Sequence, residues 1–407
     1  MGDAGGLPVS PVLPASASPA PPQATSDPQG WLQAALDYQG ISRRRFLGFA
    51  SAMTALLALP AAMTPQIVHA LETKPKPTVI WMEFQDCAGN TESMLRSSHP
   101  AIADIVLDAI SLEYHETIMA GAGSAAEKVR DDIVKSGKPY VLIVEGSIPT
   151  AENGIYCTIG GRTAIDLLRE TAAGAALVIA VGACAWDGGF PRLGPTGAVG
   201  VGDIIGNKAL INLGGCPHNV ANTTATLVHY LTFGSAPALD QYNRPLFAYG
   251  HLNHDQCERR AHFDAGRFVE AWGDEGHRSG WCLYKTGCKG PQATYNCPIV
   301  RWNDGVNWPI GAGHGCVACA SPRFWERMSP FYERLPGVQM FGGDVQAQTI
   351  GLAAVGFVAI ATVAHGAGVV ARRARERKRA TVAPDGTVVP EATPTPAEAS
   401  DDAGTSA

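Results

Sequence analysis

Charged residues are scarce in this sequence. Only 17 % of its 407 residues carry a charge, whereas 46 % are hydrophobic, so the chain can bury a substantial core. An excess of basic residues is also lacking, because the formal net charge is −6. Nucleic-acid binding requires a basic face, so this composition argues against nucleic acid as a partner.

Cysteine is too sparse for a disulfide-stapled scaffold, with ten residues in the chain. The cysteines are nevertheless too clustered to be scattered core side chains. The segment from His254 to Cys319 is rich in glycine and proline, which suits loops wrapped around a bound group. Thiolate sulfur and imidazole nitrogen at short, uneven spacings suit iron-sulfur clusters or zinc. The candidate ligands are His254, Cys257, Cys282, Cys288, Cys297, Cys316 and Cys319.

The amino-terminal region, residues 1–70, begins with about forty residues rich in Pro, Ala and Ser, which predict a disordered leader. Consecutive arginines from Arg43 to Arg45 then precede an uncharged apolar run, and a small-residue site ends at Ala70. This pattern resembles a twin-arginine export signal that is cleaved after Ala70. A retained membrane helix is the weaker alternative, because the run is shorter than the roughly 20 apolar residues of a span.

Short apolar runs and helical segments alternate from Thr78 onward. Nearly continuous apolar runs of this length predict buried parallel strands. Their alternation with helices predicts an open α/β sheet with right-handed crossovers. The expected strands are residues 79–84, 140–144, 176–181 and 209–213. The expected helices are residues 101–117, 125–135, 163–173 and 219–233.

Three cysteines come directly after three of these strands. Cys87 follows the first strand, Cys184 the third and Cys216 the fourth. Because ligands of such sheets bind beyond the carboxyl ends of the strands, we expect the three thiols to converge there. Nearby glycines let backbone N–H groups approach cluster sulfur atoms. Cys157 lies in an ordinary apolar stretch and is interpreted as a small core residue.

A long uncharged segment lies near the carboxyl end. Residues 350–371 are dominated by Ala, Val, Gly and Ile and are long enough to span a bilayer. Residues 372–379 are strongly basic, which predicts that residues 372–407 stay cytoplasmic and end in a disordered tail. The preceding domains are therefore expected on the extracytoplasmic, periplasmic face of the cell membrane, in agreement with the export signal.

The order and spacing of these motifs resemble the small subunit of a nickel-iron hydrogenase of the membrane-bound, exported uptake type. The resemblance implies a flavodoxin-like open parallel sheet domain over residues 76–245. A loop-rich iron-sulfur domain over residues 246–345 follows it. A common ancestor with respiratory complex I would explain the first domain but not the second. The resemblance is carried by residues 86–89, 182–185, 215–217, 254–257, 261–269, 280–291, 295–298 and 308–319.

The resemblance also implies three clusters in a line. A proximal 4Fe-4S cluster would use Cys87, Cys184 and Cys216. A distal 4Fe-4S cluster would use His254, Cys257, Cys282 and Cys288. A medial 3Fe-4S cluster would use Cys297, Cys316 and Cys319, with Pro309 near the place of a fourth thiolate. Proline cannot ligate iron, so three cysteines favour a cluster that lacks one iron, and a neutral histidine ligand should raise the distal potential.

One departure from the family's pattern affects the proximal cluster. Most members have Cys-x-Gly-Cys in the first motif, whereas the second cysteine position here is Asn90. Three arrangements are open: a three-iron cluster, ligation by Asn90, or ligation by Asp86 beside Cys87. We expect Asp86 as the fourth ligand, because a carboxylate binds iron better than an amide oxygen does. The high-affinity, actinobacterial-like branch of the family has such a three-cysteine, one-aspartate cluster.

The roles of several neighbouring side chains stay open at this point. Gly89 and Gly189 stand where some oxygen-tolerant members have two further cysteines, so a six-cysteine proximal site is not expected. Glu92 and Glu145 either take part in proton movement or, as is more usual for titratable groups near sites, hold a loop. His218 either donates to a cluster sulfur or caps the following helix.

The resemblance predicts an electron-transfer protein that is not catalytic alone. No segment supplies the Cys-x-x-Cys pairs that hold nickel and iron in the family's large subunit. We expect a heterodimer with that large subunit, assembled as a dimer of heterodimers. It would pass electrons from H2 to a cytochrome b or another quinone-linked membrane partner. The alternatives are a subunit of another exported membrane oxidoreductase and an exported binding protein with disulfide bonds.

Overall fold

The computed structural model describes residues 43–97, 110–206, 208–303, 305–335, 338–340, 343–345, 347–380 and 386. The chain divides into two units, Met1–Leu335 and Pro336–Ala407. The predicted leader over the first forty residues lies outside the described residues, and so does nearly all of the predicted tail.

Five parallel strands form the central sheet of the first unit. They are β1 (Thr78–Glu83), β2 (Ser111–His115), β3 (Tyr140–Glu145), β6 (Leu177–Val181) and β7 (Leu210–Leu213). Their order is β2-β1-β3-β6-β7, which is the flavodoxin-like arrangement. Four of the strands match the predicted apolar runs to within one residue, and the predicted open α/β fold is confirmed.

The predicted helix over residues 101–117 is wrong where the structure describes this stretch. Ser111–His115 form the edge strand β2, and residues 101–109 lie outside the described residues. A register shift in the pairing with β1 skips Glu113, so Leu112 and Tyr114 pack against opposite faces of the sheet. In the sequence, residues 111–115 do alternate polar and apolar side chains, but the run is only five residues long and directly follows the largely apolar residues 101–110, so the sequence predicts one helix over the whole stretch.

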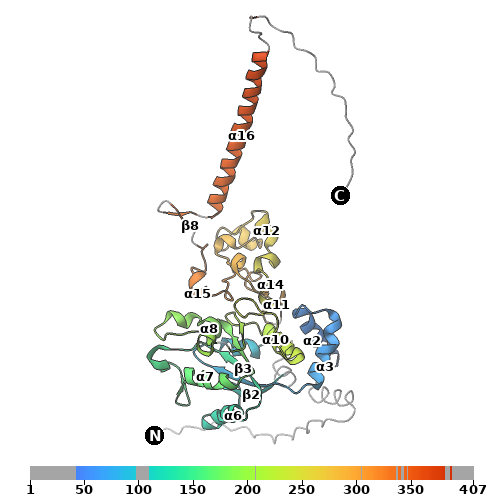
Figure 1. Cartoon of the computed structure of the whole chain (residues 1–407), viewed down its shortest axis with the longest axis vertical. Helices are drawn as coiled ribbons and strands as arrows, with labels where there is room; N and C mark the ends of the chain where they lie inside the picture. Colours follow the sequence, from blue (N-terminus) through green and yellow to red (C-terminus); the bar gives the residue numbers. More distant parts are fainter. Residues whose placement is uncertain are drawn as a thin grey trace, which may run out of the picture. The chain divides into compact units, whose positions relative to one another are not determined.

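Alternate strand residues contribute to two hydrophobic cores, one on each face of the sheet. Ile80 and Leu142 face the core that includes residues of α6, α7 and α9. Trp81 and Ile143 face the core that includes residues of α4, α10 and the loop-rich segment (Figure 1). The predicted helices over 125–135, 163–173 and 219–233 are confirmed. The helices are α4 (Gly89–Leu95), α6 (Ser124–Lys135), α7 (Ala164–Gly174), α8 (Gly182–Asp187), α9 (Val201–Ile205) and α10 (Val220–Phe233).

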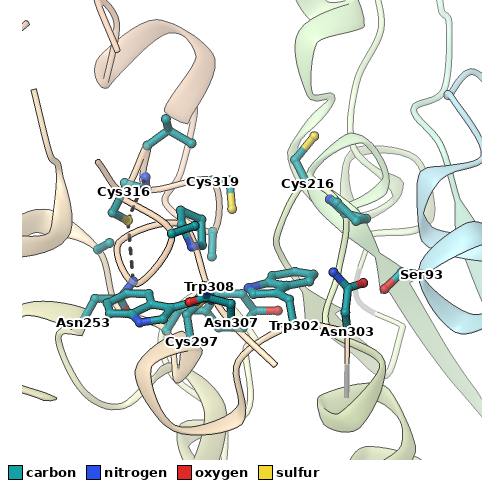
Figure 2. Close-up of a pocket in the computed structure, with 18 of the residues that line it drawn as sticks. Ser93, Cys216, Asn253, Cys297, Trp302, Asn303, Asn307, Trp308, Cys316 and Cys319 are labelled. Carbon is teal, nitrogen blue, oxygen red and sulfur yellow. Dashed lines mark hydrogen bonds between the residues drawn. The ribbon is translucent and has the colours of Figure 1, made fainter. Parts of the chain in front are cut away.

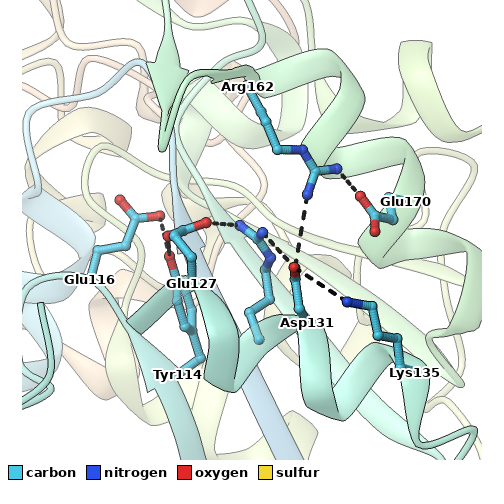
Figure 3. Close-up of polar contacts among 8 residues, drawn as sticks. Tyr114, Glu116, Glu127, Asp131, Lys135, Arg162 and Glu170 are labelled. Atoms are coloured by element: carbon cyan, nitrogen blue, oxygen red, sulfur yellow. Dashed lines mark hydrogen bonds and ion pairs between the residues drawn. The ribbon is translucent and has the colours of Figure 1, made fainter. Parts of the chain in front are cut away.

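A network of charged side chains ties α6 to the hairpin of β4 (Thr158–Ile159) and β5 (Arg162–Thr163). Arg130 on α6 is buried and forms ion pairs with Glu127 and Asp131, the latter at 2.8 Å (Figure 3). Arg162 lies 3.8 Å from Asp131. These partners offset the cost of burying a guanidinium, so the network is a packing feature of the fold.

Beyond residue 245 the chain forms short helical turns joined by loops, as expected. These are α11 (Leu246–Tyr249), η5 (Asn253–Gln256), α12 (Arg260–Asp264), α13 (Glu275–Arg278), η6 (Tyr284–Thr286), η7 (Gly290–Gln292), α14 (Cys297–Val300) and α15 (Phe324–Arg327). Shorter pieces elsewhere are η1 (Ala61–Met63), η3 (Ala151–Gly154) and η4 (Phe190–Leu193). The loop-rich segment packs on the same core as the sheet, so both belong to one compact unit.

Arg244 joins the sheet to the loop-rich segment. Its buried guanidinium pairs with Asp240 at 2.8 Å and donates to the Ala320 carbonyl at 2.6 Å and to Thr294 Oγ1 at 3.1 Å. Three aromatic ring centroids lie 5.0 to 5.3 Å from its central carbon. A cation that is surrounded by aromatic faces and hydrogen-bond acceptors is held in one position.

The segment with the predicted export signal forms a pair of helices, α2 (Arg43–Leu56) and α3 (Thr64–Thr73), beside α10 (Figure 1). Met53 and Ile67 of this pair pack against Val228 of α10. Ala70, after which cleavage is predicted, is buried within α3. Cleavage at this site stays a prediction.

The second unit contains a small hairpin, β8 (Val338–Met340) with β9 (Gly343–Val345), and the long helix α16 (Ala347–Ala380). The segment Ile350–Arg377 of α16 is long enough and apolar enough to cross a membrane. Their mean hydropathy over the most apolar window is 1.9. The predicted span over residues 350–371 falls within this helix and is consistent with a membrane anchor.

Candidate cluster-binding sites

The loops after β1, β6 and β7 bring Cys87, Cys184 and Cys216 together at the carboxyl edge of the sheet. The Ala183 amide donates to the Gly215 carbonyl at 2.6 Å, and this hydrogen bond joins the segment after β6 to the segment after β7. Burial, followed by the neighbouring Cys216 and Cys87 thiols, raises the pKa of Cys184 to about 12. The neighbouring thiols thus disfavour the thiolate form of Cys184, and a positively charged metal centre would reverse this effect.

The two candidates for a fourth proximal ligand differ in their hydrogen bonds. The Asn90 side chain is engaged on both sides, because its nitrogen donates to Glu145 at 3.1 Å and its oxygen accepts from the His218 backbone N–H at 2.8 Å. Asp86 Oδ1 accepts from the Ala88 N–H at 3.1 Å, whereas Asp86 Oδ2 is buried and has no hydrogen-bond partner among the residues that the structure describes. Burial, followed by the nearby Glu145, raises the pKa of Asp86 to about 7. A buried carboxylate oxygen without a hydrogen-bond donor needs an explanation, and ligation of a metal would supply one.

Glu145 holds the loop after β1 in place. Its carboxylate is fully buried at the end of β3 and accepts five hydrogen bonds of 2.6 to 3.4 Å. The donors are the backbone and side chains of Asn90 and Thr91 and the indole of Trp81. Glu92, by contrast, is exposed and lies 3.9 Å from Arg96. The geometry supports the loop-holding interpretation for Glu145.

His218 connects this loop to the one that carries Cys216. Its Nδ1 lies 3.2 Å from Asn90 Oδ1, and its buried Nε2 has no partner. Burial lowers the pKa of His218 to about 3, so the ring is neutral. The helix-capping role is wrong, because Asn219 caps α10 by accepting from the Ala221 N–H at 3.0 Å.

One cavity in the loop-rich segment is lined by all four side chains predicted for the distal site, namely His254, Cys257, Cys282 and Cys288. Backbone N–H groups point at two of the sulfurs. The Arg259 N–H lies 3.4 Å from Cys257 Sγ, and the Gly290 N–H lies 3.4 Å from Cys288 Sγ. Burial lowers the pKa of His254, which favours the neutral imidazole that a ligand must present.

A larger cavity of about 620 Å³ is lined by the residues predicted for the medial site, namely Cys297, Cys316, Cys319 and Pro309 (Figure 2). Cys316 Sγ accepts from the Ala318 N–H at 3.3 Å and lies 3.6 Å from Asn253 Nδ2. Burial, followed by the Cys319 and Cys316 thiols, raises the pKa of Cys297 well above its usual value. The three thiols therefore face a shared space.

The three groups of thiols follow one another through the unit. Cys216 lines the 620 Å³ cavity together with the medial cysteines. The Cys316 backbone N–H donates to Cys288 Sγ at 3.3 Å, so the medial and distal cavities meet at one stretch of backbone. Gly315 allows this approach, because a Cβ there would lie 3.0 Å from the Cys288 Cα. The order is therefore sheet edge, medial cavity, distal cavity.

The spacing of these side chains disfavours a mononuclear metal. Within the described ranges, no three His, Cys, Asp or Glu side chains could hold a single metal ion together. All ten cysteines lie in those ranges, and all are free. Widely spaced thiols suit a polynuclear iron-sulfur group better than one zinc ion. The disulfide-bonded alternative has no paired cysteines to support it.

Sequence reasoning missed the side chains that complete the medial cavity. Asn253, Trp302 and Trp308 line it, and they come from the short turn η5 and from loops, none of which has apolar periodicity. The only signal available was the Trp308-Pro309 pair among polar and glycine residues. Cys157, as predicted, is half-buried and packs against the core between the sheet and α7.

Comparison with known proteins gives two family matches. Residues 249–332 match the family that describes the C-terminal part of the NiFe/NiFeSe hydrogenase small chain. Residues 87–230 match the family described as NADH ubiquinone oxidoreductase, 20 Kd subunit. The uptake hydrogenase small subunit of Azotobacter vinelandii is 46 % identical over 332 residues, which cover 81 % of this chain and 92 % of that protein. The quinone-reactive Ni/Fe-hydrogenase small chain of Wolinella succinogenes is 43 % identical over 341 residues, which cover 81 % of this chain and 96 % of that protein.

Solved structures share the fold of the first unit. The [NiFeSe]-hydrogenase from Desulfomicrobium baculatum aligns with a TM-score of 0.60 and 34 % identity, covering 64 % of this chain and 99 % of that one. The actinobacterial-type NiFe-hydrogenase from Ralstonia eutropha H16 aligns with a TM-score of 0.59 and 25 % identity. The alignment covers 71 % of this chain and 91 % of that one.

Replacing Glu145 should loosen the loop that carries Asp86 and Cys87. In Glu145→Ala the buried donors of Asn90 and Thr91 lose their acceptor, so we expect destabilisation by about 3 kcal/mol or more. Hydrogen exchange at the amides of residues 90 and 91 should accelerate together with a lower melting temperature. Glu113→Ala, at an exposed position of β2, is the control and should change neither measurement. Unchanged exchange in Glu145→Ala would contradict the loop-holding role.

Proposed function

Because this chain belongs to the nickel-iron hydrogenase small-subunit family, we propose that it relays electrons from hydrogen oxidation through three iron-sulfur clusters to a quinone-linked membrane partner. It is the electron-transfer small subunit of a membrane-bound uptake hydrogenase, in a family that carries iron-sulfur clusters. Such clusters, when bound, accept and release single electrons. The observation that carries the proposal is the succession of three neighbouring thiol groups from the sheet edge to the distal cavity.

We assign a 3Fe-4S cluster to Cys297, Cys316 and Cys319. Pro309 lines the same cavity, and a proline cannot provide a fourth ligand to iron. A 4Fe-4S cluster is assigned to the distal cavity, where three thiols and the His254 imidazole complete a set of four ligands.

The proximal site is assigned a second 4Fe-4S cluster that is held by Cys87, Cys184, Cys216 and Asp86. The unpartnered Asp86 Oδ2 supports this ligand over Asn90, whose amide is engaged by Glu145 and His218. Ligation requires Asp86 to be ionised, and the positive charge of bound iron favours that form.

The exposure of the proximal thiols supports a large subunit at this edge of the sheet. Cys87 and Cys216 are exposed in the isolated chain. Most of the distal and medial cysteines are buried, namely Cys282, Cys288, Cys297 and Cys316. A cluster at the sheet edge would thus be protected from solvent only by a partner. In the family this partner is the large subunit with the nickel-iron centre, and we propose a dimer of such heterodimers.

We propose that electrons leave this chain toward a quinone in the membrane. The relative from Wolinella succinogenes is described as quinone-reactive, and α16 provides an apolar helix long enough to anchor the chain. The basic residues after position 371 favour a cytoplasmic carboxyl end, with the cluster domains on the extracytoplasmic face. A cytochrome b is the expected electron acceptor. Membership of the actinobacterial-like branch stays a prediction, since identity to that structure is 25 %.

Purification of the gently solubilised native complex tests the proposal. We expect this chain to co-purify with a nickel-containing large subunit and to contain iron and acid-labile sulfide. The complex should reduce a quinone analogue with H2, whereas this chain alone should not oxidise H2. An iron-sulfur complex without nickel would indicate a different oxidoreductase and contradict the proposal.

Two glycines with left-handed backbone test the position of Cys184 in the proximal site. A Cβ at Gly189 (φ +58°) would lie 2.5 Å from Cys184 Sγ, whereas one at Gly161 (φ +79°) has no atom within 4 Å. Alanine is strained at both positions, by about 1–3 kcal/mol, and Gly189 (ψ −162°) lies in a backbone region that is essentially restricted to glycine. Only Gly189→Ala should also lose iron and the proximal EPR signal. Equal iron contents in the two variants would contradict the assignment of Cys184.

Replacing Asp86 tests the fourth proximal ligand. In Asp86→Ala the carboxylate is absent, so we expect a lower iron content and an altered EPR signal from the proximal cluster. Asp86→Cys restores a fourth thiolate and should retain the full iron content at a lower midpoint potential, because thiolate donates more charge to iron.

Asn90→Ala serves as the comparison for this prediction. It should preserve the iron content, because Asn90 acts through hydrogen bonds to Glu145 and His218. If Asn90→Ala lost iron and Asp86→Ala did not, the amide would be the ligand and the assignment of Asp86 would be wrong.

A further inference from the structure

We propose that the indole N–H of Trp308 donates a hydrogen bond to a sulfur atom of the medial cluster, and that this hydrogen bond raises the reduction potential of that cluster. The inference rests on the proposed function, because it requires a cluster at Cys297, Cys316 and Cys319. Trp308 is thus a positioning and tuning residue, not an iron ligand.

The first observation is an unsatisfied buried donor. Trp308 is only 3 % exposed, and its Nε1 has no hydrogen-bond partner in the described part of the protein. A buried donor without an acceptor loses its hydration without compensation, so native proteins rarely retain one. The backbone N–H of the same residue is satisfied by Asn307 Oδ1 at 2.9 Å, so only the indole is left without a partner.

The second observation is the location of this donor. Trp308 lines the 620 Å³ cavity together with the three medial cysteines, and Pro309 follows it directly. Figure 2 shows Trp308 and Asn253 side by side, with Cys316 above them in this view. The group that fills this cavity would present sulfur atoms as acceptors, in keeping with the N–H to sulfur contacts of such clusters.

The third observation is that a neighbouring side chain already donates toward sulfur. Asn253 Nδ2 lies 3.6 Å from Cys316 Sγ, and Asn253 is 2 % exposed. The backbone of Asn253 is fixed by a 2.8 Å hydrogen bond to the Ala293 carbonyl. At least one side chain that lines this cavity thus already directs an N–H group at a cluster-site sulfur.

The direction of the effect follows from electrostatics. Reduction adds negative charge to the cluster, and an N–H dipole directed at sulfur stabilises the reduced form more than the oxidised form. In a buried cavity this interaction is stronger than in water, because the surrounding dielectric constant is low. Removal of the indole N–H should therefore make the cluster harder to reduce.

The test is Trp308→Phe in the complete complex with its large subunit. Phenylalanine keeps an aromatic ring and removes the N–H. A redox titration followed by the EPR signal of the oxidised three-iron cluster should show a midpoint shifted to lower potential, with the same number of spins per protein. The control is Trp272→Phe, because Trp272 is 46 % exposed and does not line the cavity. It should leave the midpoint unchanged.

A second measurement begins with the wild-type complex, so its first result does not depend on the stability of the variant. Wild-type complex with 15N-labelled tryptophan should show nitrogen hyperfine coupling to the three-iron signal, and this coupling should weaken in Trp308→Phe. A wild-type midpoint in Trp308→Phe, or no indole coupling in the labelled wild type, would overturn the inference while the proposed function stands. Absence of any three-iron signal from the oxidised wild-type complex would instead contradict the proposed medial cluster.

Discussion

The buried carboxylate of Glu145 is the constraint on which the proximal end of the structure depends. It lies at the point where the strand order of the sheet reverses, between β1 and β3, where ligands of such sheets bind. Its five hydrogen bonds offset the cost of burial and hold the loop that begins at Asp86. Asn90 extends this link to His218, so the loops of Cys87 and Cys216 are held by one continuous set of hydrogen bonds.

A second set of contacts relates the sheet edge to the medial cavity. The Tyr249 hydroxyl donates to the Gly214 carbonyl at 2.8 Å, and its ring stacks on Tyr295 at a centroid distance of 4.8 Å. The Tyr295 hydroxyl in turn accepts from the Asn219 N–H at 3.0 Å. With Arg244 bound to the Ala320 carbonyl, these aromatic and polar contacts join the loops of Cys216 and Cys319. Electron transfer between neighbouring clusters requires fixed separations, and this rigid packing would provide them.

Asn90 illustrates how a lost ligand position can become structural. The family pattern has a thiolate here, but the amide bridges Glu145 and His218 instead. Gly182 makes room for it, because a Cβ there would lie 2.4 Å from Asn90 Oδ1. Asn90 thus helps to hold the loop after β1, and within the described residues the neighbouring Asp86 Oδ2 has no hydrogen-bond partner.

The sequence by itself determined four of the five strands and the long helices, because buried strands are continuous apolar runs. The membership of the candidate ligand sets was predicted from the family resemblance and stays a prediction. Sequence reasoning failed at β2, which is only five residues long and directly follows a largely apolar stretch. Only the tertiary structure decided the contacts of Glu145 and Asn90 and the place of Trp308 in the cavity wall, since each depends on partners that are distant in sequence or on a cavity enclosed by several loops. Local patterns record periodicity and composition, but hydrogen-bond satisfaction is a property of the assembled fold.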